Sequence, residues 1–167
     1  MNKLNLPIKF GTEGWRGIIA DDFTFDNVKL CSQAVAELIH SNKLKGEKAV
    51  LIGYDTRFGS ESFAQIAAET IASNGIPVTL SNKPCPTPVL SYNAKLKNYQ
   101  ATIIITASHN SYKWNGFKLK LGYGGPADEK TIAELEKQIS LTVKRGKSLI
   151  LKRKQSIKYC NPDETYL

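Results

Sequence analysis

Two hydrophobic patterns alternate along the 167 residues of this chain. Short, continuous apolar runs have the length and composition of strands that are covered on both faces. Between them lie longer segments in which apolar residues recur every three or four positions, as on one face of a helix. The predicted strands are 48–54, 76–80, 101–105 and a shorter alternating run at 116–121, and the predicted helices are 28–39, 60–74, 87–97 and 128–140. Strands that alternate with helices of this length are typical of a three-layer α/β/α domain with a mainly parallel, mixed sheet.

Residues with known preferences for helix ends mark the limits of these segments. We expect Thr24 or Asp26 to cap the first helix and Ser60 to cap the second, because their side-chain oxygens accept from free backbone N–H groups. At Thr87-Pro88 the threonine can cap the third helix while proline occupies its first turn.

The chain is expected to form one domain over residues 1–143, followed by a basic segment over residues 144–167. That segment holds seven Lys and Arg against two Asp and Glu, so it carries most of the formal net charge of +8. A basic segment can contact nucleic acid, but the apolar residues 149–151 and the absence of a series of aromatic residues argue against that role. We interpret the segment as a linker or as the start of a second domain.

The composition narrows the class of protein. Hydrophobic residues make up 41% and charged residues 23%, which are the values of a globular chain. No apolar run approaches the roughly 20 residues of a membrane helix, and the N-terminus lacks the apolar core of a signal peptide. Three widely spaced cysteines without a Cys-x-x-Cys pair indicate buried thiols, not a zinc site or disulfides. We therefore expect a soluble, cytoplasmic protein with neither a membrane nor a nucleic acid as partner.

Three polar loops follow the predicted parallel strands, at the sheet edge where ligands bind in such folds. They are residues 55–59, 83–88 and 106–111. In the last, an isoleucine strand passes abruptly into a hydroxyl, an imidazole and an amide. Ser and Asn favour turns, so a plain turn is the simpler explanation. Ser108 beside His109, with Lys118 on the next strand, also suits nucleophilic or phosphoryl chemistry.

A glycine-rich segment near the N-terminus, Gly11–Gly17, contains Arg16. Glycines let backbone amides approach an anion, and arginine supplies a planar fork of donors for phosphate. The segment is not a Walker loop, because no Gly-Lys-[Ser/Thr] follows, and glycine-rich turns are often only turns.

Together these segments resemble the first domain of the α-D-phosphohexomutases, the phosphoglucomutase/phosphomannomutase family, from about residue 10 to 140. Thr106-Ala107-Ser108-His109-Asn110 is similar to the family's phosphoserine loop. Four other segments match in the family's order: Phe10–Gly17, Gly53–Arg57, Thr87-Pro88 and Asn115–Lys118.

The resemblance implies an isomerase that moves a phosphoryl group between the 1- and 6-positions of a hexose phosphate. Ser108 would be the phosphocarrier, making the chain a phosphoprotein of carbohydrate metabolism. Its phosphate would give one oxygen to Mg²⁺, and hexose 1,6-bisphosphate would act as intermediate and activator.

The resemblance assigns the other site residues by position. Lys118 is the candidate for proton transfer at the sugar hydroxyl, and His109 would orient or protonate. Arg16 would support the phosphoserine and the transferred phosphate. Thr12 and Asn110 would bind phosphate of the substrate.

The chain departs from the family pattern in two ways. Ser111 stands where the family usually has proline. The family's metal-binding Asp-Gly-Asp-x-Asp loop and its sugar-specificity loop belong to later domains and are not found here. We therefore expect the chain alone to have little or no mutase activity and to need those C-terminal domains as partners.

Two questions of function stay open at this point. Trp15 and Thr106 favour glucose or mannose phosphate over glucosamine phosphate, because the glucosamine-phosphate enzymes more often have Ile and Ser there. The alternative to a mutase domain is a stand-alone module that binds phosphate or phosphosugars, or a subunit that lends Ser108 to another chain.

Overall fold

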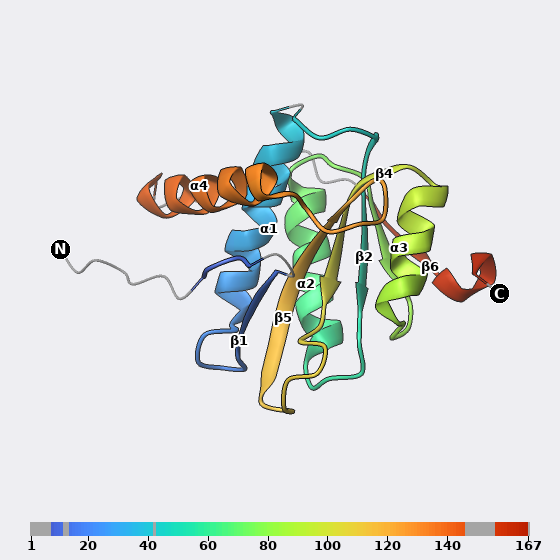
Figure 1. Cartoon of the computed structure of the whole chain (residues 1–167), viewed down its shortest axis with the longest axis horizontal. Coiled ribbons are helices and arrows are strands. Elements are labelled where there is room, and N and C mark those ends of the chain that lie inside the picture. Colours follow the sequence, from blue (N-terminus) through green and yellow to red (C-terminus); the bar gives the residue numbers. More distant parts are fainter. Residues whose placement is uncertain (1–7, 12–13, 42, 146–155, 167) are drawn as a thin grey trace.

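A mixed sheet lies between helices that cover both of its faces (Figure 1). The computed structural model describes residues 8–11, 14–41, 43–145 and 156–166. The strands are β1 (Trp15–Ile18), β2 (Glu47–Tyr54), β3 (Val78–Ser81), β4 (Tyr99–Ile105), β5 (Trp114–Leu121) and β6 (Ile157–Cys160). The helices are α1 (Phe25–His40), α2 (Ser60–Ser73), α3 (Thr87–Leu96), α4 (Glu129–Arg145) and the 3₁₀ helix η1 (Pro162–Thr165).

The strand order across the sheet is β1-β5-β4-β2-β3-β6. Strands β4, β2, β3 and β6 are parallel, whereas β5 runs antiparallel to both of its neighbours, β4 and β1. This confirms the predicted α/β class with a mainly parallel, mixed sheet. We call the edge at which β4, β2 and β3 end the carboxyl edge, and the opposite edge the amino edge.

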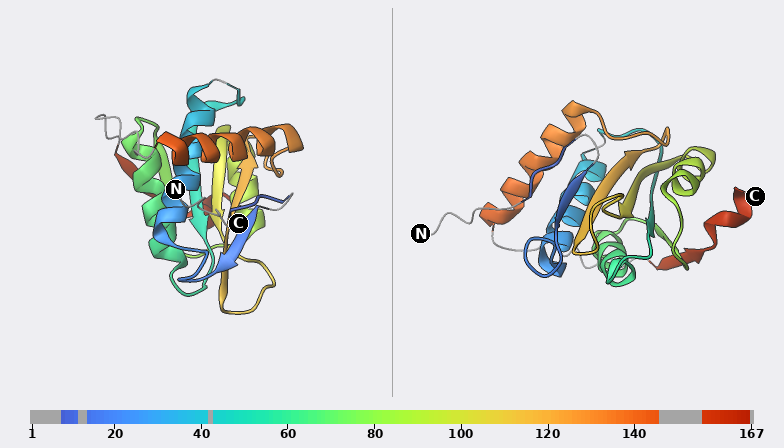
Figure 2. Two further views of the ribbon diagram at one scale, coloured as in Figure 1. Left: turned by 90° about the vertical axis from the view of Figure 1, so that its left-hand side faces the viewer. Right: turned by 60° about the horizontal axis from the view of Figure 1, so that its bottom comes forward.

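Helices lie on both faces of the sheet (Figure 2). Each face has its own hydrophobic core. Ile52 and Ile103 belong to the larger core, which they share with α1, α2 and α4. Leu51 and Ile104 point to the other face and pack with Leu90 of α3. A Cβ at Gly53 would lie 2.4 Å from a Leu90 methyl, so this glycine is what lets α3 approach β2 so closely.

Most predicted elements form within a few residues of their expected limits, and Thr24 caps α1 by accepting from the Asn27 N–H at 3.2 Å. Ser60 does not cap α2, contrary to expectation. It is the first helical residue, and Gly59 takes the cap position with φ +74°. The Ser60 hydroxyl donates instead to Asp55 Oδ1 at 2.7 Å.

Strand β1 departs from the expectation, because the glycines of this segment indicate a turn. Trp15 is only 2% exposed and stacks on Phe23 with 4.9 Å between ring centroids. Pairing with β5 therefore carries an aromatic side chain into the core while Arg16 stays on the exposed side.

The C-terminal segment differs from the expected linker. Helix α4 continues past residue 143 to Arg145, and β6 adds a parallel strand next to β3. The Asn93 amide donates to the Pro162 carbonyl at 2.9 Å, and Lys83 pairs with Asp163 at 2.6 Å. The end of the chain is thus part of this domain, while the basic residues between 146 and 155 lie outside the described residues.

No helix in the described part of the chain combines the length and the apolar composition needed to cross a bilayer.

Candidate active site

The loop between β4 and β5 holds Ser108 in an unusual backbone conformation at the carboxyl edge. Ser108 has φ +56°, a left-handed value that few residues other than glycine adopt. Its N–H donates to Thr106 Oγ1 at 3.0 Å, and its side chain is exposed. Strain of this kind persists only where the surroundings enforce it, and it concentrates at functional sites.

His109 is the side-chain partner of the Ser108 hydroxyl. Ser108 Oγ and His109 Nδ1 are 3.1 Å apart, a hydrogen-bond distance, and both side chains are exposed. The tautomer of the imidazole decides which atom donates. In either case the ring fixes the direction in which the hydroxyl points.

Arg16 reaches the same loop from the strand β1. One of its guanidinium nitrogens donates to Asn110 Oδ1 at 2.8 Å. The approach depends on Gly116 of β5, which lies between β1 and β4. A Cβ there would lie 2.5 Å from the Thr106 carbonyl oxygen and 3.0 Å from that of Trp15.

Lys118 lies deeper in the sheet than the other candidates. It occupies β5 opposite Ile104, and only 7% of its surface is exposed. The sequence places it on the strand that follows the Ser108 loop, and the structure confirms that position. Thr12, the remaining candidate, lies outside the described residues.

Arg57 is the residue that sequence reasoning missed. Its side chain donates to four backbone carbonyls of the Ser108 loop and the start of β5. The acceptors are Ser108 at 2.8 Å, Asn110 at 2.6 Å, Ser111 at 2.8 Å and Trp114 at 3.1 Å. One guanidinium therefore fixes the conformation of the Ser108 loop. The sequence marks residues 55–59 as polar and well placed, but no local pattern shows which carbonyls an arginine side chain will reach.

Asp55 holds Arg57 in place. Its Oδ2 lies 3.2 Å from Arg57 Nε, and its Oδ1 accepts from the Arg57 N–H at 3.0 Å. Ser60 also donates to this Oδ1 and in turn accepts from Asn115 Nδ2 at 2.9 Å. The network links the ends of β2 and β4 to the start of β5 through one ion pair and several hydrogen bonds.

The described residues do not form a complete metal site. No group of three or more His, Cys, Asp or Glu side chains gathers among them. Both oxygens of Asp55 are already engaged by Arg57 and Ser60. The described residues therefore offer a cation only single, separate oxygen ligands.

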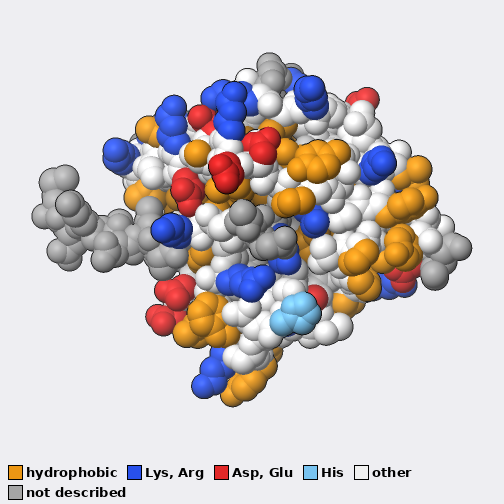
Figure 3. All heavy atoms as spheres, in the orientation of Figure 1, with side chains coloured by type: hydrophobic (Ala, Val, Ile, Leu, Met, Phe, Trp, Pro, Cys, Tyr) orange, Lys and Arg blue, Asp and Glu red, His pale blue; other side chains and the backbone are white. Residues whose placement is uncertain are grey.

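The chemistry of the site suits an anionic ligand. Figure 3 shows a histidine beside lysine and arginine side chains on the lower part of the visible face. An exposed hydroxyl with an adjacent imidazole and a guanidinium can accept or donate a phosphoryl group and balance its charge.

Comparisons with known proteins agree with this geometry. Residues 7–145 match the family model described as phosphoglucomutase/phosphomannomutase, alpha/beta/alpha domain I. A Haemophilus influenzae protein described as a phosphomannomutase is 39% identical over 121 residues, which are 66% of this chain and 24% of that protein. A Cellvibrio japonicus phosphoglucosamine mutase is 32% identical over 130 residues, covering 78% of this chain and 29% of the relative.

Among solved structures, a Thermus thermophilus protein described as a phosphomannomutase superposes with a TM-score of 0.82 at 29% identity. The match covers 96% of this chain and 34% of that one. The chain thus spans about a quarter to a third of the length of these relatives. From its sequence, its sheet and the loop that carries Ser108, the chain belongs to the phosphoglucomutase/phosphomannomutase family and corresponds to its α/β/α domain I.

Proposed function

We propose that this chain is the phosphoserine-bearing domain of a hexose-phosphate mutase. The observation that carries the proposal is Ser108, held in a left-handed conformation with its exposed hydroxyl bonded to His109, in a loop that the guanidinium of Arg16 reaches at Asn110. A loop built only as a turn would not need four carbonyls bound to one half-buried arginine.

The proposed reaction transfers phosphate from Ser108 to a free hydroxyl of a hexose phosphate. The Ser108 Oγ–P bond breaks, a bond forms between phosphorus and the sugar oxygen, and the hydroxyl proton leaves to Lys118. His109 protonates the departing Ser108 oxygen. The hexose 1,6-bisphosphate then reorients in the site and transfers its other phosphoryl group to Ser108 by the reverse steps. Added bisphosphate therefore acts as an activator.

Each residue has a physical task in this scheme. Arg16 balances the negative charge on the phosphoryl group, and Asn110, which binds Arg16, keeps that guanidinium facing the loop. Arg57 does not face the substrate, because its donors are occupied by carbonyls. It is a positioning residue for Ser108.

Mg²⁺ enters the proposal only through Ser108. When bound, a divalent cation neutralises charge on a phosphoryl group. The contribution we assign to this chain is one oxygen of the Ser108 phosphate, with the other ligands supplied by later domains of a longer enzyme.

We propose glucose or mannose phosphate as the substrate, on the basis of Trp15 and Thr106. Trp15 is buried against Phe23, so it marks a subfamily and does not contact the sugar. Thr106 acts on the loop, through its bond to the Ser108 N–H. Relatives described as acting on mannose and on glucosamine phosphates match at 39% and 32% identity, so a substrate assay decides this point.

The test is phosphorylation of Ser108. After incubation with glucose 1,6-bisphosphate, peptide mass spectrometry is expected to find phosphate on Ser108, none in Ser108→Ala, and an unchanged yield in the matched variant Ser111→Ala. In the full gene product, Ser108→Ala is expected to abolish mutase turnover, and turnover that persists would refute the proposal.

The alternative, a stand-alone phosphosugar-binding module or a subunit lending Ser108 to another chain, is tested by the gene itself. A reading frame that continues past codon 167 into an Asp-Gly-Asp-x-Asp loop supports the mutase. A stop codon there, together with tight binding of glucose 1,6-bisphosphate by the 167-residue chain, supports the module.

A further inference from the structure

Asn115 is a buried polar residue to which the proposed reaction gives no task. It opens the segment Asn115–Lys118, in which only Lys118 has a proposed role. Its exposed fraction is 0%, although its side chain is an amide. A buried amide costs free energy unless hydrogen bonds replace its lost hydration, so the partners of Asn115 show what the residue does.

Both ends of the Asn115 amide are hydrogen-bonded. Oδ1 accepts from the Gly116 N–H at 2.8 Å, and Nδ2 donates to Ser60 Oγ at 2.9 Å. Exchanging the two ends would turn the NH₂ group toward the Gly116 N–H, so these contacts fix the orientation of the amide. Ser60 is only 1% exposed, and the bond between the two side chains is therefore shielded from water.

The Ser60 hydroxyl gives this contact a direction. It has a single hydrogen, which it donates to Asp55 Oδ1 at 2.7 Å. Toward Asn115 it can therefore only accept, and Asn115 is the donor. The Asp55 carboxylate in turn accepts from the Arg57 N–H at 3.0 Å and pairs with Arg57 Nε at 3.2 Å. A chain of bonds with defined donors and acceptors thus joins Asn115 to Arg57.

Asp55 sets the orientation of the Arg57 guanidinium. It holds Nε, whereas the two terminal nitrogens donate to the four carbonyls of the Ser108 loop and the start of β5. The guanidinium is planar and rigid, so a rotation at Nε moves all four of those bonds together. The position of the Ser108 backbone therefore depends on Asp55, and that of Asp55 depends on the Ser60 hydroxyl.

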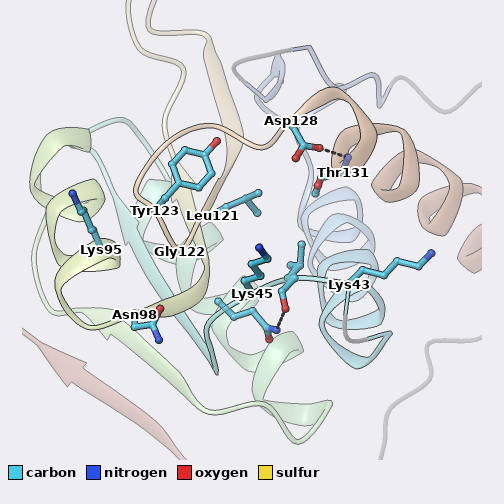
Figure 4. A pocket seen from close by; sticks show the side chains of 11 residues that line it. Lys43, Lys45, Lys95, Asn98, Leu121, Gly122, Tyr123, Asp128 and Thr131 are labelled. Atoms are coloured by element: carbon cyan, nitrogen blue, oxygen red, sulfur yellow. Dashed lines mark hydrogen bonds between the residues drawn. The ribbon is translucent and has the colours of Figure 1, made fainter.

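Gln100, a second buried amide of the sheet, shows that burial alone does not create such a connection. It lines the hollow at the amino edge that Figure 4 shows. Its Nε2 donates to the Leu44 carbonyl at 2.7 Å, and its Oε1 accepts no hydrogen bond from any residue that the structure describes. The Gln100 amide thus ends at one backbone carbonyl, whereas the Asn115 amide leads through side chains to the Ser108 loop.

We propose that Asn115 is a positioning residue for Ser108. Its amide keeps the Ser60 hydroxyl turned toward Asp55, and Asp55 holds the guanidinium that fixes the Ser108 loop. Bonds in such a chain polarise one another, so loss of the first donor is felt along all of it. The inference rests on the function proposed above, in which Ser108 carries the phosphoryl group. Because Asn115 is fully buried, it affects the rate of transfer and not the binding of substrate.

The test is Asn115→Asp, which keeps the shape of the side chain but replaces its donor with an oxygen. Ser60 can then donate to only one of two carboxylates, and the chain of bonds is broken at neutral pH. The maximal rate of Ser108 phosphorylation by glucose 1,6-bisphosphate is expected to fall about tenfold in the 167-residue chain. The KM for the bisphosphate is expected to stay the same within about twofold.

The pH profile separates positioning from a general loss of structure. Burial beside Asp55 raises the pKa of the new carboxyl, so acid protonates it and restores a donor toward Ser60. The rate of Asn115→Asp, divided by that of the original chain at the same pH, is therefore expected to rise toward one between about pH 8 and pH 5. A ratio that does not change with pH would contradict the proposal.

Proton exchange at Arg57 provides a readout that needs no phosphorylation. In Asn115→Asp and in Ser60→Ala, the NMR signal of the Arg57 Nε–H is expected to exchange with water about tenfold faster. Gln100→Glu makes the same change at the other buried amide, and Ser32→Ala removes a hydroxyl that is buried in α1. Both controls are expected to leave this exchange unchanged.

Unchanged exchange at Arg57 in both test variants would overturn the proposal, and so would a higher KM with an unchanged maximal rate. Should Asn115→Asp fail to fold, Ser60→Ala carries the rate and exchange measurements. If the original chain takes no phosphate on Ser108, the proposed function fails, and the exchange at Arg57 still decides whether Asn115 holds the guanidinium.

Discussion

The buried polar groups at the two edges of the sheet differ in how completely they are hydrogen-bonded. At the carboxyl edge, Asp55, Arg57 and Ser60 bind one another and four carbonyls in a connected network. At the amino edge, Gln100 Oε1 and, farther along β4, Thr102 Oγ1 are buried with no partner among the described residues. A closed network holds its groups still, whereas a buried acceptor without a donor lowers the stability of the fold.

Among substitutions at the carboxyl edge, Arg57→Ala is expected to have the largest effect. The change removes the guanidinium from Asp55 Oδ2 and from four backbone carbonyls of the loop and the start of β5, and we expect a loss of about 2–4 kcal/mol in the free energy of unfolding. Phosphorylation of Ser108 by glucose 1,6-bisphosphate is expected to slow about 100-fold, since small misplacements of a reacting group have effects of that size.

Arg57→Lys is the matched variant for this prediction. It keeps the charge but lacks the planar fork, so it is expected to recover stability in urea unfolding more than it recovers the phosphorylation rate. Equal recovery of both, or an Arg57→Ala rate within twofold of the original, would contradict the positioning role.

A substitution at Gly116 tests the close approach of β1, β5 and β4 independently of Arg57. In Gly116→Ala the new Cβ would meet the Thr106 and Trp15 carbonyls, so we expect a loss of about 2–3 kcal/mol in urea unfolding. Gly11→Ala is the control, because the nearest atom among the described residues, apart from its chain neighbours, would be the Gly14 carbonyl oxygen at 3.8 Å. Equal stability of the two variants would show that the strands can separate without penalty.

The interior beneath the carboxyl edge is expected to respond to alkaline pH. Burial raises the pKa of the Cys85 thiol to about 11, above its value in the unfolded chain. The folded state therefore keeps this proton longer, and the stabilisation it provides is complete below about pH 9 and lost as the pH rises toward 11.

The expected effect of Cys85 is about 1 kcal/mol between pH 8 and pH 10, after allowance for screening. It is measured as the difference in urea unfolding between the original chain and Cys85→Ala at each pH. Parallel pH profiles of the two proteins would refute the assignment to Cys85.

The smallest expected effects compare Thr102, inside β4, with Thr106, the residue that follows this strand. Thr102→Val removes an unpaired buried hydroxyl and keeps the shape, so we expect a gain of about 0.5–1 kcal/mol. Thr106→Val removes the acceptor of the Ser108 N–H, so we expect a loss of about 1 kcal/mol. Thermal unfolding of both variants checks the sign, and a common sign would mean that the two edges do not differ as described.

Local sequence predicted the elements that depend on short-range pattern. The runs of apolar residues in β2 and β4 and the helical spacing in α1 were found because burial and capping act within a few residues. The Ser108 loop was found for the same reason: polar residues directly follow a buried strand. Strand β1 was missed, because glycines suggest a turn, whereas Gly14 lets the start of this strand approach the backbone of β5 at Phe117.

Other features depend on which distant residues meet. The assignment of residues 157–160 to the sheet rests on pairing with β3, about 80 residues earlier, which no local pattern shows. The same holds for the reach of Arg57 to carbonyls more than 50 residues away and for the unpaired oxygen of Gln100. The sequence by itself determined the layers of the fold and pointed to Ser108, the residue that we propose as the phosphocarrier. Only the tertiary structure decided what holds that serine in place, because these hydrogen bonds form between elements that the chain order keeps far apart.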